Sequence, residues 1–276
     1  MPAEGNRDAR FTIFRAPARC VGALVSELAQ HTGQVLALVR ERKPRVHCIT
    51  NTVVQGFTAN MLLAAGAIPS MTTSPEEIAN FVAGADALLV NLGTFDPERR
   101  DAVGIALEIA AEEGVPWVLD PVLIECSPAR AIFARSLAGR EPRVVRANEA
   151  EFAALIEGAA TAEALDKFAI GHLTVAARTG AIDLVTDGTR RASVANGHAF
   201  MAQVTGIGCA ESALIAALLA VEDEPFGAAV GGLVALGVAG EIAAEKARGP
   251  GSFAVELVDA LAALDVAALN ARAKLS

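Results

Sequence analysis

The chain has few aromatic residues from which to build a core. It contains no tyrosine and one tryptophan among 276 residues, and aromatic residues make up 4% of the whole. Since 53% of the residues are hydrophobic, the core must consist mainly of Ala, Val, Leu and Ile, which suit close packing of helices on a sheet. A chain of this length forms one large α/β domain or two small ones.

Cysteine is also scarce, and its positions are scattered. The four cysteines form no C-x-x-C pair; they are Cys20, Cys48, Cys126 and Cys209. This spacing argues against a disulfide framework and against a zinc site. It is typical of a protein that works in the reducing cytoplasm.

Positive charge is limited as well. The formal net charge is −9, and no basic run is longer than Arg99-Arg100 or Arg190-Arg191, which argues against a nucleic-acid partner. The first residues are charged and lack the apolar run of a secretory signal. Segment 226–244 comes nearest to a membrane span, but its glycines and alanines favour a buried helix. We therefore expect a cytoplasmic protein with no membrane partner.

Strands and helices alternate through most of the chain. Apolar runs predict strands at 45–50, 67–71, 85–92, 117–119 and 143–146. Helices are predicted at 21–42, 53–65, 97–113, after Ser127-Pro128, and around 149–156. Strands that are apolar on both faces and alternate with helices predict a three-layer α/β fold, with helices on both faces of a mainly parallel sheet.

Other local signals predict where elements begin and turn. Ser74-Pro75-Glu76-Glu77 predicts a helix that has Ser74 as its N-cap. Asp187-Gly188 predicts a hairpin turn among short strands at 173–177, 182–186 and 192–194, and hence an antiparallel edge of the sheet. We interpret residues 1–18 as an N-terminal arm and residues 19–276 as one domain, because no repeat or linker divides them.

Polar residues stand at the ends of four predicted strands. They are Asn51, Asn91 with Thr94, Asp120 and Asn148. Each one alone is more often a helix cap than a ligand contact. Because ligands of open α/β sheets bind beyond the carboxyl ends of the strands, the whole set favours a functional site at this edge.

A glycine turn opens an apolar helix late in the chain. Thr205, Gly206, Ile207 and Gly208 form the turn, and Cys209 falls in the first turn of the helix. Free backbone N–H groups and the helix dipole make such a place suitable for an anion, such as the phosphoryl group in a kinase. A cysteine there is favoured as a thiolate. Short glycine turns are weak signals, so an ordinary loop before a buried helix is the alternative.

Six short motifs occur along the chain. They are His47-Cys48-Ile49-Thr50-Asn51, Asn91-Leu92-Gly93-Thr94, Asp120-Pro121-Val122, Val185-Thr186-Asp187-Gly188, Val204-Thr205-Gly206-Ile207-Gly208-Cys209 and Gly249-Pro250-Gly251-Ser252-Phe253. Their order and approximate spacing, over about residues 20–270, resemble those of the hydroxyethylthiazole kinase family. The resemblance implies a ribokinase-like fold and ATP- and Mg²⁺-dependent phosphorylation of 4-methyl-5-(2-hydroxyethyl)thiazole in thiamine salvage. It also implies a homotrimer with active sites at subunit boundaries.

The resemblance implies catalytic and nucleotide-binding roles for particular residues. Gly206, Gly208 and Cys209 would form the anion hole, with Cys209 either assisting as a base or only shaping the turn. Cofactor contacts would come from Arg130 to phosphate, from Thr179 near the nucleotide, and from Asn148 at the start of an N-x-x-E pattern.

Metal and substrate contacts follow from the same resemblance. Glu151, the acid of the N-x-x-E pattern, and Asp120 would help to order Mg²⁺, although Glu151 is equally typical of a solvated helix acid. Met71, Gly206 and Asn51 would contact the thiazole, although a core position is the more usual one for a methionine. His47 begins a strand beside this site, and we expect it to have a structural hydrogen-bonding role.

Several residues depart from the family pattern on the nucleotide side. Leu123, Ile124 and Glu125 stand where the family has small residues that allow a close approach of phosphate. Ile207 lies between the two glycines of the turn, and Glu211 in the first turn of the helix would repel phosphate. Two alternatives therefore remain. One is a divergent member that binds a thiazole-like ligand with weakened or lost catalysis, and the other is a ribokinase-like kinase for another small alcohol.

Overall fold

One eight-stranded sheet runs through the molecule, in the order β2-β1-β3-β4-β5-β6-β7-β8. The computed structural model describes residues 21–276, so the predicted arm at 1–18 lies outside the described residues. The strands are β1 (Arg45–Ile49), β2 (Ile68–Ser70), β3 (Ala87–Asn91), β4 (Trp117–Asp120), β5 (Val144–Asn148), β6 (Val175–Thr179), β7 (Asp183–Thr186) and β8 (Arg191–Val194). All pairs from β2 to β6 are parallel, whereas β7 and β8 pair antiparallel, which confirms the predicted edge.

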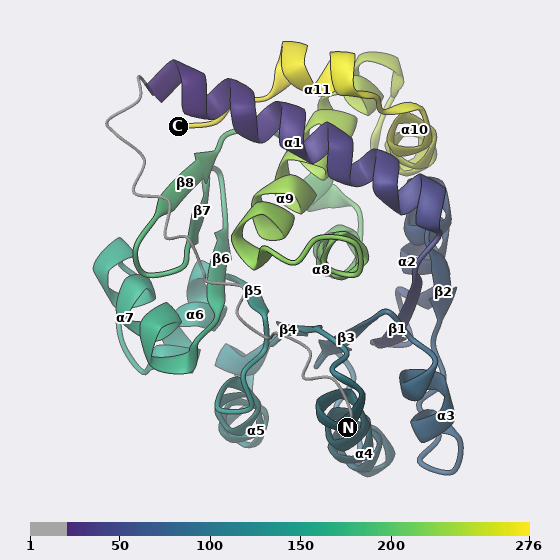
Figure 1. Cartoon of the computed structure of the whole chain (residues 1–276), viewed down its shortest axis with the longest axis vertical. Coiled ribbons are helices and arrows are strands. Elements are labelled where there is room, and N and C mark those ends of the chain that lie inside the picture. The colour runs from purple at the N-terminus through teal and green to yellow at the C-terminus, as the bar shows by residue number, and fades with distance from the viewer. Residues whose placement is uncertain (1–20) are drawn as a thin grey trace, which may run out of the picture.

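Helices cover both faces of the sheet (Figure 1). One face carries α1 (Val21–Arg42), α2 (Gln55–Ala65), α8 (Ile207–Leu219), α9 (Pro225–Lys246), α10 (Pro250–Ala263) and α11 (Val266–Arg272). The other carries α3 (Ile78–Ala83), α4 (Pro97–Glu113), α5 (Pro128–Ala138), α6 (Glu149–Ile156) and α7 (Ala162–His172). Successive strand residues enter opposite cores: Leu89 packs in the first and Leu88 and Val90 in the second. The predicted three-layer fold is confirmed.

The apolar helix α9 lies inside the protein. It is long and apolar enough to cross a membrane, but 89% of its most apolar window is buried. Its glycines let α8 approach closely, because a Cβ on Gly232 would lie 2.4 Å from Cγ1 of Ile215. The predicted buried helix at 226–244 is therefore confirmed.

Most predicted local signals are found in the structure, with one exception. Ser127 caps α5, where its Oγ accepts a hydrogen bond from the N–H of Arg130 over 3.4 Å. The prediction for Ser74 is wrong, because α3 begins at Ile78 and Glu77 is its N-cap residue. The Thr72 hydroxyl hydrogen-bonds the Glu77 carboxylate and accepts from the N–H of Ser74 over 3.4 Å. These local contacts hold the segment as a turn instead of a first helical turn.

Candidate active site

The polar ends of β3 and β4 meet at one buried carboxylate. Oδ2 of Asp120 accepts hydrogen bonds from Nδ2 of Asn91 over 2.7 Å and from Oγ of Ser212 on α8 over 2.9 Å. Oδ1 accepts no hydrogen bond from residues 21–276, which the structure describes, and lies 4.0 Å from Nη1 of Arg146. Burial raises the pKa of Asp120 to about 7. The predicted strand-end site therefore contains an acid with one free oxygen.

The glycine turn begins α8 beside this carboxylate. Gly206 is the N-cap residue, has a φ of +93° and makes no side-chain cap. A Cβ at this position would lie 2.6 Å from Cγ1 of Val54, so both the backbone conformation and the space require glycine. The first N–H groups of α8 consequently lack a side-chain cap, as the predicted anion site requires.

Cys209 is linked to the end of β1. Its Sγ accepts a hydrogen bond from Nδ2 of Asn51 over 3.4 Å, and Oδ1 of Asn51 accepts from the N–H of Val53 over 3.1 Å. Burial, and then the charge of Asp120, raise the pKa of the Cys209 thiol to about 12. The expected thiolate is therefore not found, because desolvation outweighs the helix N-terminus.

A buried ion pair lies between β5 and α8. Nε and Nη2 of Arg146 donate to Oε2 of Glu211 over 3.0 Å and 2.9 Å. A Cβ on Gly208 would lie 2.8 Å from Nη1 of Arg146, so the guanidinium lies directly against the glycine turn. Burial raises the pKa of Glu211, whereas the charge of Arg146 opposes this shift and favours the carboxylate. Arg146 was not predicted from the sequence as a site residue. The only feature that could have indicated it is a positive charge in an otherwise apolar strand.

Asn148 and Glu151 form a capping box at the start of α6. Oδ1 of Asn148 accepts from the N–H of Glu151, and Oε2 of Glu151 accepts from the N–H of Asn148, both over 2.9 Å. Oε1 of Glu151 accepts from the N–H of Leu123 over 3.0 Å. Glu151 is thus buried and holds two backbone segments, whereas a solvated helix acid would be exposed.

The loop after β4 departs from the family pattern at residues 123–125, and it is partly buried. Ile124 is buried in the second core, whereas Leu123 and Glu125 are exposed. Leu123 has a φ of +59°, a conformation that a glycine adopts more readily. Of the three residues expected to hinder phosphate, only Leu123 and Glu125 are therefore exposed to an approaching ligand.

A cavity of about 650 Å³ brings several predicted residues together. Asn148, Thr179, Gly206 and Gly208 line it with the Arg146–Glu211 pair. Thr179 is the register partner of Asn148 across β5 and β6. Two of the three predicted nucleotide contacts, Asn148 and Thr179, therefore share this cavity.

Six predicted site residues do not line this cavity; they are Asn51, Met71, Asp120, Arg130, Glu151 and Cys209. Nη1 of Arg130 donates to the Val122 carbonyl over 3.1 Å, and its guanidinium lies 5.7 Å from the Phe95 ring centre. Its Nε has no hydrogen-bond partner within the part of the chain that the structure describes. Met71 follows β2 and packs, partly buried, against the first core.

The side chain of His47 hydrogen-bonds the residues on either side of Met71, at the end of β2. Its ring nitrogens contact Oγ of Ser70 at 2.7 Å and the Thr72 carbonyl at 3.1 Å. The predicted structural role of His47 is confirmed.

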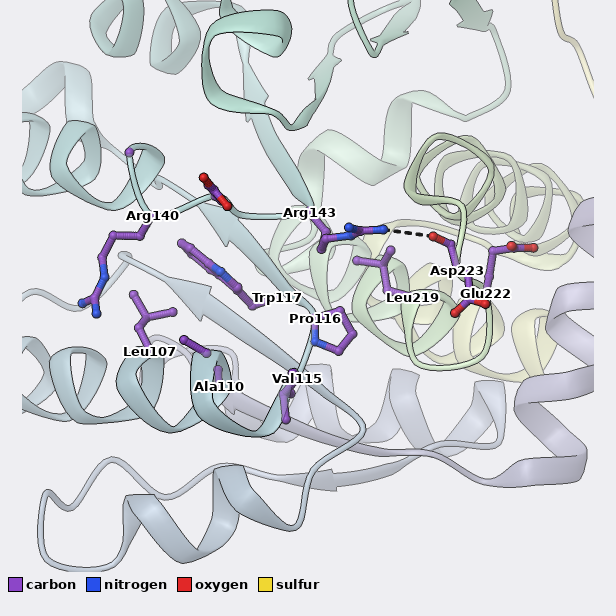
Figure 2. A pocket seen from close by; sticks show the side chains of 14 residues that line it. Leu107, Ala110, Val115, Pro116, Trp117, Arg140, Arg143, Leu219, Glu222 and Asp223 are labelled. Atoms are coloured by element: carbon purple, nitrogen blue, oxygen red, sulfur yellow. Dashed lines mark hydrogen bonds between the residues drawn. The ribbon is translucent and has the colours of Figure 1, made fainter. Parts of the chain in front are cut away.

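A larger cavity, of about 1100 Å³, lies where β4 and β5 begin, at the opposite edge of the sheet (Figure 2). Trp117 and Arg143 are among its lining residues, and Nη2 of Arg143 donates to the Asp223 carbonyl over 3.0 Å. None of the predicted site residues line it. Four of the predicted site residues, Asn148, Thr179, Gly206 and Gly208, line the smaller cavity instead.

The acids of the site fit a magnesium ion only in combination with a ligand. Among the described residues, no three His, Cys, Asp or Glu side chains cluster closely enough to hold a metal. Asp120 does offer Oδ1, a buried oxygen without a hydrogen bond. Mg²⁺ commonly uses one or two carboxylates and completes its shell with phosphate oxygens and water. These residues fit such a partial site.

Comparison with known proteins places the chain among small-molecule kinases. A model of the hydroxyethylthiazole kinase family matches residues 36–267. A probable hydroxyethylthiazole kinase of Agrobacterium fabrum is 46% identical over 84% of this chain and 89% of its own length. A hydroxyethylthiazole kinase of Granulibacter bethesdensis is 44% identical over 90% and 95%. The structure of a hydroxyethylthiazole kinase protein from Pyrococcus horikoshii matches with a TM-score of 0.84 and 40% identity, over 89% of this chain and 98% of that one.

Proposed function

The chain belongs to the hydroxyethylthiazole kinase family, and we propose that it phosphorylates the hydroxyl of 4-methyl-5-(2-hydroxyethyl)thiazole with ATP, a step of thiamine salvage. The observation that carries this proposal is the glycine turn of α8 beside Asp120, at the polar carboxyl edge of the sheet. Phosphoryl transfer depends mainly on positioning and on stabilising charge. A rigid set of backbone donors next to a buried acid meets both needs.

The nucleotide occupies the cavity between β6 and α8 in this proposal. Thr179 and Asn148 line its wall, and the N–H groups after Gly206 and Gly208 face the phosphates. The dipole of α8 favours negative charge at this end. Arg130 does not line this cavity, so its side chain must move to reach the phosphates.

The thiazole alcohol lies between Asn51, Met71 and Gly206 in this proposal. The Asn51 amide orients the Cys209 thiol toward the turn. A thiol with a pKa of about 12 keeps its proton at neutral pH, so we assign Cys209 the role of shaping and lining the turn. The loose transition state of phosphoryl transfer requires little help from a base.

We propose Mg²⁺ as the metal, with Asp120 as its nearest protein group. Oδ1 of Asp120 is the free oxygen, and Glu151 acts through water because backbone N–H groups occupy both of its oxygens. When bound with the nucleotide, the ion neutralises charge on the phosphates.

Assembly and location are further parts of the proposal. Val53, Leu63 and Ile68 are 78%, 58% and 47% exposed and belong to the β1–α2 loop, α2 and β2, the strand that Met71 follows. We propose that neighbouring copies in a homotrimer cover these side chains and border the thiazole site. Light scattering on the purified chain tests this, and a monomer would contradict it. Cys48, Cys126 and Cys209 are free thiols, which supports a cytoplasmic location.

Coupled detection of ADP release with the thiazole alcohol, ATP and Mg²⁺ tests the proposed activity. We expect turnover by the parent and none by Gly206→Ala, whose Cβ would collide with Val54. Gly251→Ala is the matched control, because nothing lies within 4 Å of the added methyl.

Two other outcomes would support the alternatives to this activity. A silent parent that still binds the thiazole alcohol in calorimetry would be a divergent binding protein. Turnover with other small alcohols, but not with this one, would identify a kinase of different specificity.

A further inference from the structure

The Arg146 guanidinium lies where the proposed function places the nucleotide phosphates. It packs against Gly208 in the turn that begins α8, and its side chain is 13% exposed. Arg146 and Glu211 both line the cavity that contains Thr179. A planar guanidinium in this position is suited to bind phosphate oxygens in pairs.

The guanidinium of Arg146 already interacts with carboxylates of this chain. Two of its nitrogens donate to one oxygen of Glu211, whose side chain is 8% exposed. Oδ1 of Asp120 is 4.0 Å from Nη1, and the charge of Asp183 acts on both Arg146 and Glu211. The charge of Glu151 also acts on Arg146, so one cation faces four acids, and a phosphate that enters must compete with them.

We infer that Glu211 is a positioning residue that sets nucleotide affinity, because its carboxylate competes with the nucleotide phosphates for Arg146. The inference rests on the proposed kinase function. While the phosphate site is free, the pair holds the guanidinium against the glycine turn. A bound phosphate shares or replaces the Glu211 contact, at the cost of repulsion between two anions at one cation. Glu211 thus weakens nucleotide binding and speeds ADP release.

Neutralising Glu211 tests this competition directly. Glu211→Gln keeps the shape of the side chain and an oxygen that accepts from Arg146, while Asp120 still faces the guanidinium. Because one like charge close to the phosphates is removed in a partly desolvated site, we expect the Kd for ADP with Mg²⁺ to fall about tenfold. Glu163→Gln, which changes an exposed acid paired with Arg191, is the control and should leave the Kd unchanged.

A double-mutant cycle identifies Arg146 as the group for which the anions compete. Arg146→Gln alone should raise the Kd for ADP about tenfold. In that background, Glu211→Gln should no longer tighten binding. A gain that persists without Arg146, or a Glu211→Gln variant that binds ADP no more tightly than the parent, would overturn the inference.

Turnover separates this inference from the proposed function. Glu211→Gln should lower the KM for ATP and leave the KM for the thiazole alcohol unchanged, a split that general loss of structure does not produce. If Glu211→Gln does not fold, Glu211→Met fills the same space without charge and should show the same tighter binding of ADP. A parent that binds ADP but does not phosphorylate the alcohol would remove the proposed activity, while the ADP titrations still decide on Glu211.

Discussion

The Asn91 amide donates a hydrogen bond of 2.7 Å to Oδ2 of Asp120, from one strand of the sheet to the next. The two residues are register partners in the parallel pair β3–β4. Ser212 donates to the same oxygen from the second turn of α8. Both donors thus fix the carboxylate through Oδ2, whereas Oδ1 has no hydrogen-bond partner in the described part of the chain and lies 4.0 Å from Nη1 of Arg146.

Asp120→Asn should separate catalysis from stability. The change preserves the size of the side chain but removes the charge, so we expect kcat to fall about hundredfold, as when a preorganised electrostatic group is lost. The KM for the thiazole alcohol should change little. Initial rates against both substrates measure this.

The stability of the same variant should move in the opposite direction. Burial raises the folded-state pKa of Asp120 to about 7, above the pKa of an aspartate in the unfolded chain. The free energy of unfolding therefore falls as the pH rises through that value, because the folded protein must then hold a buried charge. Asp120→Asn should therefore be at least as stable as the parent in urea at pH 8. Asp86→Asn, which changes an exposed acid bonded to the N–H of Arg45, is the control and should retain kcat. A variant of Asp120 with normal kcat would contradict the assigned role.

Gly93→Ala should weaken the interaction of the enzyme with the thiazole alcohol. The added Cβ would lie 2.6 Å from Nδ2 of Asn51, so Asn51 must move and lose its contact with Cys209. We expect the KM for the thiazole alcohol to rise about tenfold or more, with the KM for ATP nearly unchanged. Gly104→Ala is the control, because its methyl meets nothing within 4 Å, and it should be active. An equal rise in both KM values would mean that the damage is not local.

Cys209→Ala should retain activity within about tenfold of the parent, because a protonated thiol contributes shape and not basicity. Rates measured from pH 6 to 9 should show the same pH dependence in the parent and in Cys209→Ser. A loss of a thousandfold or more in Cys209→Ala would instead identify the thiol as a base.

The sequence was sufficient to predict the polar edge of the sheet but not the ion pair beside it. Asn91 and Asp120 end parallel strands and Asn51 follows β1 by two residues, and such ends must share an edge. Glu211 stands 65 residues after Arg146, so nothing local links the two. Only the packing of α8 on the sheet brings them together, which is why Glu211 was expected to act alone.

Leu123→Gly should stabilise the protein. The left-handed backbone of Leu123 costs a residue with a Cβ about 1 kcal/mol, and glycine avoids this cost but loses more entropy on folding. We expect a net gain of up to about 1 kcal/mol in the free energy of unfolding, measured in urea. Ala129→Gly on the exposed first turn of α5 should lose about that much. Destabilisation by both changes would show that the Leu123 side chain is needed.

The conformation of Leu123 could not have been predicted from its own residue type. Leucine rarely adopts a positive φ. The N–H of Leu123 donates to Oε1 of Glu151, a partner 28 residues away on α6. The capping box of α6 therefore fixes the loop after β4. This contact could not be predicted from the residues of the loop alone, because Glu151 is distant in the sequence.

His47→Gln should reduce the sensitivity of the fold to acid. Burial lowers the pKa of His47 to about 4, although its bond to the Thr72 carbonyl and the charge of Glu77 oppose this shift. Between about pH 6.5 and pH 4, the unfolded state therefore binds a proton that the folded state does not, so stability falls as the pH falls through that window.

Urea unfolding at pH 7.5 and pH 5.0 measures this effect. The parent should lose about 2 kcal/mol more than His47→Gln between the two pH values, because each unit of pKa difference is worth about 1.4 kcal/mol. Glutamine does not titrate, and its amide can still reach the Ser70 hydroxyl and the Thr72 carbonyl that the imidazole contacts. Equal losses in the two proteins would mean that the imidazole is already protonated in the fold at pH 5. The segment that leads from β2 to Met71 would then be held by a charged ring and not by a neutral one.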